Sequence, residues 1–80
     1  MVEMAFYINF CLVTKEEKTV YDQISYHQNG IDIDSLMFEL YIEQNIHLNI
    51  QELGEKLNSL YMIKMITFEE PVWFERIKIK

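Results

Sequence analysis

Acidic side chains are the residues of this 80-residue chain whose spacing could support chemistry. Asp32 and Asp34 stand close together, and Glu39 and Glu43 are separated by one helical turn. Paired carboxylates can act as acid and base, or bind a divalent cation. However, Asp32 and Asp34 come just before an apolar helical pattern, where capping and the helix dipole account for both. We interpret Glu39 and Glu43 as part of a solvated acidic face.

Histidine and cysteine offer little more. Cys11 is the only cysteine, which excludes an intramolecular disulfide, and with His27 and His47 it makes too small a ligand set for a structural zinc site. Tyr26 and His27 are interpreted as a structural pair at a helix end. The sequence has no glycine-rich phosphate loop, nucleophile elbow or metal-binding helix pair. We therefore expect a protein that is not an enzyme and that needs no metal or cofactor.

The charge is uneven along the chain. Thirteen acids against seven bases give a net charge of −6, and residues 64–80 hold four of the bases. A net acidic chain repels a polyanion, so a DNA-binding surface would have to concentrate its bases in this C-terminal segment. Half of the residues are hydrophobic, as expected of one folded domain spanning residues 1–80. The single cysteine and the lack of a long apolar segment predict a reducing, cytoplasmic setting and no membrane contact.

The stretch from Asn49 to Met62 has the clearest pattern in the chain. Asn49 and Glu52 have the spacing of a capping box, and Leu48 and Leu53 that of a hydrophobic staple. The pattern predicts a helix whose buried stripe comprises Ile50, Leu53, Leu57, Leu60 and Tyr61, opposite a polar face of Gln51, Glu52, Glu55, Asn58 and Ser59.

Two further helices are expected before it. Thr14 to Glu17 form a capping box for a helix that runs to about His27, with Asn29-Gly30 as its stop signal. Asp32 caps a second helix over residues 33–44, which a turn of about four residues joins to the third. The expected inner side chains of the first helix are Val20, Tyr21 and Ile24, with His27 as a further candidate. Those of the second are Leu36, Met37, Leu40 and Tyr41, with Phe38 and Ile42 on another side.

Strands are expected at both ends. Met4 to Val13 favours a strand over a short buried helix, and its aromatic side chains would make core or dimer contacts. Met62 to Phe68 and Val72 to Lys80 read as a hairpin around Glu69-Glu70-Pro71. In the second hairpin strand, Trp73, Glu75, Ile77 and Ile79 alternate with Val72, Phe74, Arg76, Lys78 and Lys80.

This order of elements resembles the winged helix-turn-helix domain. Three stretches within residues 14–80 carry the resemblance: T-K-E-E-K-T-V-Y-D-Q-I, G-I-D-I-D-S-L and L-N-I-Q-E-L-G-E-K-L-N-S-L-Y-M-I-K-M-I. They match a pattern of caps and apolar positions. The resemblance implies an α+β fold of three helices and a C-terminal two-stranded wing, with residues 1–13 as an added strand-like segment. Such a segment would suit a homodimer formed through residues 4–13.

The resemblance also implies where partners would bind. In DNA-binding winged helices the third helix occupies the major groove and the wing contacts the backbone or minor groove. Here the third helix has one lysine, two glutamates and no arginine, and the wing tip is acidic. On this pattern the third-helix surface comprises Asn49, Gln51, Glu52, Glu55, Lys56 and Ser59, and the basic surface comprises Lys64, Arg76, Lys78 and Lys80. Apolar partner contacts would come from Phe38, Ile42, Met62 and Phe74.

Three hypotheses follow. The first is a regulatory or adaptor module that acts through protein contacts in transcription or another nucleic-acid process, which would also suit an accessory protein of a virus or mobile element. The second is a dimeric, sequence-specific DNA-binding regulator that uses the basic surface. The third is an inhibitor that mimics DNA with carboxylates on one face.

Overall fold

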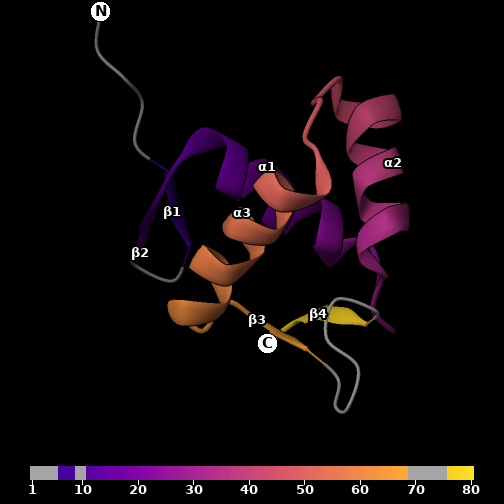
Figure 1. The fold of residues 1–80 in the computed structure, drawn as a ribbon. Helices are drawn as coiled ribbons and strands as arrows, with labels where there is room; N and C mark the ends of the chain where they lie inside the picture. Colours follow the sequence, from indigo (N-terminus) through magenta and orange to yellow (C-terminus); the bar gives the residue numbers. More distant parts are fainter. Residues whose placement is uncertain (1–5, 9–10, 69–75) are drawn as a thin grey trace, which may run out of the picture.

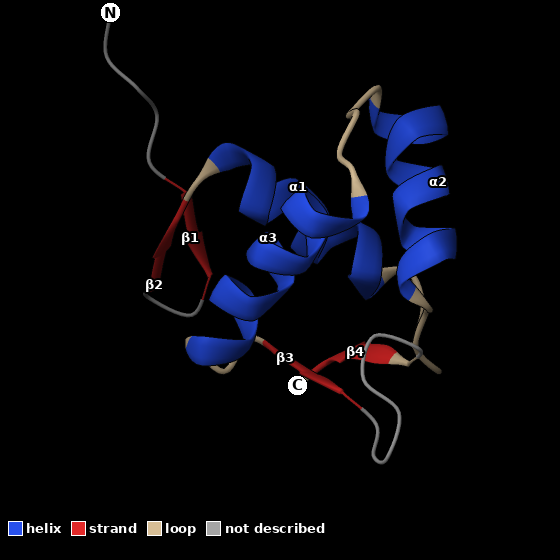
Figure 2. Cartoon of the chain, viewed as in Figure 1, coloured by secondary structure: helices blue, strands red, loops and turns tan. Residues whose placement is uncertain are grey.

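The described part of the chain is α+β, with three helices and two two-stranded antiparallel sheets (Figures 1 and 2). The computed structural model describes residues 6–8, 11–68 and 76–80. The elements are β1 (Phe6–Ile8), β2 (Cys11–Val13), α1 (Lys15–Ser25), α2 (Ile33–Gln44), α3 (Ile50–Met62), β3 (Ile66–Phe68) and β4 (Ile77–Ile79). The expected order of three helices followed by a two-stranded sheet is therefore confirmed, and it is compatible with a winged-helix arrangement.

Local capping sets the starts of all three helices. At α1, the Thr14 hydroxyl accepts from the Glu17 N–H and the Glu17 carboxylate accepts from the Thr14 N–H, and Asn49 and Glu52 repeat this exchange at α3. At α2, the Asp32 carboxylate accepts from the Ser35 N–H. These bonds satisfy backbone donors that the first turn of a helix leaves free. The predicted bounds of α2 and the predicted starts of α1 and α3 are correct.

The end of α1 differs from the prediction. The helix stops at Ser25, and its capping residue Tyr26 keeps a right-handed conformation. Gly30 does have a positive φ of 94°, but it belongs to the following turn, where its N–H donates to the carbonyl of His27. A Cβ at Gly30 would lie 2.5 Å from Cγ of Arg76. Glycine is therefore required both by the turn and by the side chain packed over it.

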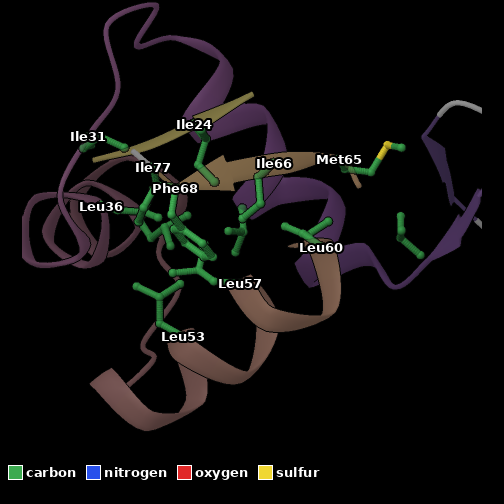
Figure 3. Packing of buried hydrophobic residues seen from close by; sticks show 13 residues of the cluster. Ile24, Ile31, Leu36, Leu53, Leu57, Leu60, Met65, Ile66, Phe68 and Ile77 are labelled. Carbon is green, nitrogen blue, oxygen red and sulfur yellow. The ribbon is translucent and has the colours of Figure 1, made fainter. Parts of the chain in front are cut away.

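The core forms around the leucine stripe of α3 (Figure 3). Leu53, Leu57 and Leu60 are fully buried, as the periodicity predicts. Burial of each such side chain contributes roughly 1.5–3 kcal/mol to folding. The side chains that complete the core come from every other helix and from the C-terminal sheet, and they include Val20, Ile24, Ile31, Leu36, Leu40, Ile66, Phe68 and Ile77.

Five predicted core positions are wrong or only partly right. Ile50 is 55% exposed because it lies in the first turn of α3, and Tyr41 is 50% exposed on α2. Tyr61 is 38% exposed, although its ring packs against Phe68 with centroids 5.1 Å apart. Met37 and Tyr21 are partly buried against the core. The buried stripes of α2 and α3 are thus narrower than the apolar patterns indicated.

Ile31, from the link between α1 and α2, extends the C-terminal sheet by one residue. Strands β3 and β4 pair in antiparallel register, with Phe68 opposite Ile77. On the other edge of β4, the Ile31 N–H donates to the Ile77 carbonyl (3.1 Å) and the Ile77 N–H donates to the Ile31 carbonyl (2.8 Å). The link that precedes α2 therefore pairs with the last strand. The expected hairpin tip, Glu69 to Pro71, and residues 72–75 lie outside the described residues.

The N-terminal segment forms a hairpin, whereas one strand was predicted from Met4 to Val13. Strands β1 and β2 pair with each other, with Phe6 opposite Val13 and Ile8 opposite Cys11. Asn9 is the one turn-favouring residue in this otherwise apolar run, and it was not recognised as the sign of a reversal. Figure 1 shows this hairpin at one end of the molecule and α2 at the other, with α1 and α3 between them. None of the helices in the described part of the chain has the length and apolar character needed to cross a bilayer.

The two glycines provide a matched test of this fold. Gly30→Ala should lower the free energy of unfolding by about 1 kcal/mol or more, because φ is positive and Arg76 occupies the space of the new methyl group. Gly54→Ala should raise it by up to about 1 kcal/mol, since Gly54 lies within α3 and nothing is within 4 Å of a new Cβ. Urea unfolding followed by circular dichroism measures both. A Gly30→Ala protein as stable as the parent would contradict the described turn.

Candidate interaction surface

The outer face of α3 is exposed and acidic. Gln51, Glu52, Glu55 and Ser59 of the predicted third-helix surface are all exposed, and so is Asn49 at the cap. Lys56 is the exception, because it is partly buried and its Nζ lies 3.2 Å from Oε1 of Glu16. The one base of α3 is therefore engaged with α1.

The start of α1 lies beside α3 and adds two glutamates to its surface. Between them is a hollow of about 360 Å³, which we call the acidic groove. Two of its carboxylates are held by backbone N–H groups, Glu17 by Thr14 (2.8 Å) and Glu52 by Asn49 (3.0 Å). The lining residues are Thr14, Glu16, Glu17, His47, Leu48, Glu52, Glu55, Lys56 and Ser59.

Sequence reasoning missed Glu16 and Glu17 as part of this surface. Their capping role was readable, but the approach of α1 to α3 depends on tertiary packing. The acidic groove combines four carboxylates with one lysine, which is already paired within it. Its potential is therefore more negative than α3 alone would produce.

A second hollow is apolar and lies along α2. This apolar groove has a volume of about 600 Å³, and the ring of Tyr41 meets that of His47 edge-on within its lining, with centroids 4.5 Å apart. Phe38 is 66% exposed. The lining residues are Asp34, Met37, Phe38, Tyr41, Ile46, His47, Leu48 and Asn49.

The other predicted apolar contacts are placed differently. Ile42 is 59% exposed and follows Phe38 by one helical turn, so the two share a side of α2. Met62 is 76% exposed at the end of α3 and lines neither groove. Phe74 lies outside the described residues. Exposed apolar side chains thus lie on α2, as Phe38, Tyr41 and Ile42, and also on α3, as Ile50, Tyr61 and Met62.

The predicted basic residues gather at the C-terminal sheet, apart from the acidic groove. Arg76 donates from Nη1 to the Asn29 carbonyl (3.2 Å), and the stems of Arg76 and Lys78 lie over Gly30. Lys80 donates its backbone N–H to the carbonyl of Met65, the residue after Lys64. Arg76 and Lys78 therefore lie together over Gly30, and none of the four predicted bases lines the acidic groove.

A cluster of polar side chains joins α1 to α2, and the prediction for Glu39 is wrong because this residue belongs to it. This carboxylate was expected on a solvated face with Glu43, but its Oε1 accepts from Nε2 of Gln23 (2.8 Å) and lies 2.7 Å from Nε2 of His27. Gln23 is buried, and its own oxygen accepts from Gln44 (3.2 Å). A buried amide needs such partners, since leaving it unpaired would cost about 1–3 kcal/mol. Glu43 is exposed as expected.

Two carboxylates have shifted pKa values. Burial of Glu39 raises its pKa, but the hydrogen bonds from His27 and Gln23, with the charge of His27, outweigh burial and place the pKa below its ordinary value of 4.5. Hydrogen bonds from Ser35 lower the pKa of Asp32 below 3.8. Both groups thus stabilise the fold as anions, one between helices and one at a helix start.

No family model matches the chain, and no curated protein or solved structure is significantly similar to it. Within residues 6–8, 11–68 and 76–80, no three histidine, cysteine, aspartate or glutamate side chains gather as metal ligands would. Function is therefore inferred from the surfaces described above.

Glu39→Gln should lower the free energy of unfolding at neutral pH by about 1 kcal/mol, because it replaces charge-assisted hydrogen bonds with neutral ones. A lowered carboxyl pKa stabilises the folded state above the unfolded pKa, and that stabilisation is lost as the pH falls through the folded pKa. The difference between parent and variant should therefore shrink below pH 4.5.

Urea unfolding at a series of pH values measures this difference. Glu43→Gln is the matched control, since it makes the same charge change one turn further along α2 at an exposed position. Equal effects of the two substitutions at every pH would contradict the role of Glu39.

Proposed function

We propose that this chain is a winged-helix regulatory or adaptor module that acts through protein contacts in transcription or another nucleic-acid process. Three observations support a winged-helix assignment: the order of helices and sheet, the capped turn between α2 and α3, and the pairing of Ile31 with β4. The proposal for function depends on one further observation. The face of α3 that would read DNA lies in a groove of four glutamates, and its only lysine is paired with Glu16.

Electrostatics argues against duplex DNA at this face. Affinity for DNA comes largely from neutralising phosphates with lysine and arginine, and bases are read mostly by arginine, lysine, asparagine and glutamine. Glu16 and Glu17 flank α3, so a duplex in contact with it would bring phosphates close to carboxylates. A protein partner can instead meet these carboxylates with bases of its own.

Exposed apolar side chains favour a protein partner as well. Phe38, Tyr41 and Ile42 are each at least half exposed within two turns of α2. Aromatic and aliphatic side chains gathered in this way are typical of protein interfaces, whereas scattered ones are not informative. The N-terminal hairpin is a separate candidate for a homodimer contact, with Leu12 of β2 65% exposed.

A specific observation favours DNA binding as a second candidate function. Arg76, Lys78 and Lys80 alternate along β4 with buried Ile77 and partly buried Ile79, so the bases share the side of the strand that faces away from the core. A dimer could present two such surfaces to a duplex. This candidate predicts binding that weakens steeply with salt.

Light-scattering mass of the protein, alone and with random duplex DNA at low and moderate salt, separates the two functions. The proposed function predicts no DNA complex at moderate salt. A complex that persists there and is lost in an Arg76→Gln, Lys78→Gln variant would overturn it in favour of the second candidate. The mass of the protein alone also reports whether it forms a dimer.

Charge reversal at Glu52 and Glu55 tests the assigned surface. With the protein as bait in a lysate of its source organism, Glu52→Lys, Glu55→Lys should lose a partner that the parent retains, because its bases would meet lysines in place of carboxylates. Glu43→Lys is the control, since it reverses a charge at an exposed position of α2 that lines neither groove. If every partner of the parent remains bound to the α3 variant, the acidic face of α3 is not the contact surface.

A further inference from the structure

We propose that the apolar groove and the acidic groove form one continuous docking site for a basic amphipathic segment of another protein. Bulky apolar side chains of that segment would fill the apolar groove, and its lysine or arginine side chains would lie along the acidic groove. This inference rests on the proposed function and names the chemistry of the partner.

The two grooves adjoin at the turn between α2 and α3. His47 and Leu48 line both of them, so a segment that leaves one groove passes directly into the other. Leu48 is partly buried, whereas His47 is exposed and its ring packs edge-on against Tyr41. His47 and Leu48 therefore form the part of the site that both grooves share.

The apolar groove suits anchoring side chains. Its volume of about 600 Å³ lies within the range of sites that enclose large organic groups. Met37 is unbranched and adaptable, and Phe38 and Tyr41 supply rings at the surface. Grooves of this composition accept one face of an amphipathic helix, with apolar side chains one turn apart.

The acidic groove determines the charge of the occupant. Glu16, Glu17, Glu52 and Glu55 face a single lysine, and that lysine is paired with Glu16. Asp34 adds a carboxylate in the lining of the apolar groove. A segment with bases beside its apolar positions would match this distribution of charge along its length.

A second copy of this chain fits the site less well. The chain carries a net charge of −6. A twofold symmetric contact centred on this site would bring the acidic grooves of the two copies close together. Like charges in such a contact weaken association. Charge complementarity thus selects a basic segment of a different protein as the occupant.

Three synthetic helical peptides test the proposal. The first carries leucines on one face and lysines on the other, the second has glutamate in place of lysine, and the third has serine in place of leucine. Each is titrated into the ¹⁵N-labelled full chain and followed by amide chemical shifts. The lysine–leucine peptide should shift amides in both grooves and weaken with salt, and the other two should bind at least about tenfold more weakly.

Matched variants distinguish binding at this site from non-specific attraction between the acidic chain and a basic peptide. Phe38→Ser and the pair Glu52→Gln, Glu55→Gln should each weaken the lysine–leucine peptide by about tenfold. Met62→Ser and Glu43→Gln make comparable changes at exposed positions outside both grooves and should alter affinity by less than about twofold. All of these residues are exposed, so the variants should fold.

Several results would overturn the inference. They are an absence of binding by the lysine–leucine peptide, equal effects of the groove and control variants, and a serine-substituted peptide that binds as well as the leucine one. Self-association that Phe38→Ser abolishes would identify a second copy as the occupant. A protein partner insensitive to the groove variants would end this inference but leave the proposed function standing. A DNA complex on β4 with no protein partner would end both.

Discussion

Burial of the α3 leucine stripe is the constraint on which the rest of this structure depends. Leu53, Leu57 and Leu60 present one narrow apolar surface, and α1, α2 and the C-terminal sheet each cover part of it. A core built from so few residues is small, so all three helices and the C-terminal sheet contribute to this one cluster. The packing of α1 against α3 also determines the charge of the surface, because it places Glu16 and Glu17 beside the polar face of α3.

Local signals explain which parts of the fold were predictable from the sequence. The bounds of α2 and the starts of α1 and α3 follow from caps whose donors and acceptors lie within four residues, so no knowledge of the tertiary fold was needed. The pairing of β1 with β2 was not predicted, because Asn9 is the only turn-favouring residue in a run that otherwise has the pattern of one apolar strand. Asn29-Gly30 was recognised as a stop signal, but α1 already ends at Ser25 and the positive φ of Gly30 belongs to the following turn.

The candidate site was only half visible in the sequence, for a related reason. The helical pattern of α3 identified Glu52, Glu55 and Ser59 as exposed, and that of α2 identified Phe38 and Ile42 as lying away from the core. It could not reveal which side chains from other helices would lie opposite. The pairing of Lys56 with Glu16 and the contact of Glu39 with Gln23 both join different helices. The first engages the one lysine of α3, and the second takes Glu39 out of the expected solvated face.

The bridge between Ile31 and Ile77 has a consequence for how the domain forms during synthesis. Both backbone groups of Ile31 bond to a residue 46 positions later, and Ile77 is fully buried. A nascent chain that has released only its three helices would have a core open on the side where β4 packs against α1. Long-range contacts of this kind delay folding, because the intervening chain must be ordered first. The helices should therefore associate loosely on the ribosome and gain fixed packing only when β4 arrives, which leaves the incomplete chain open to proteases and chaperones until then.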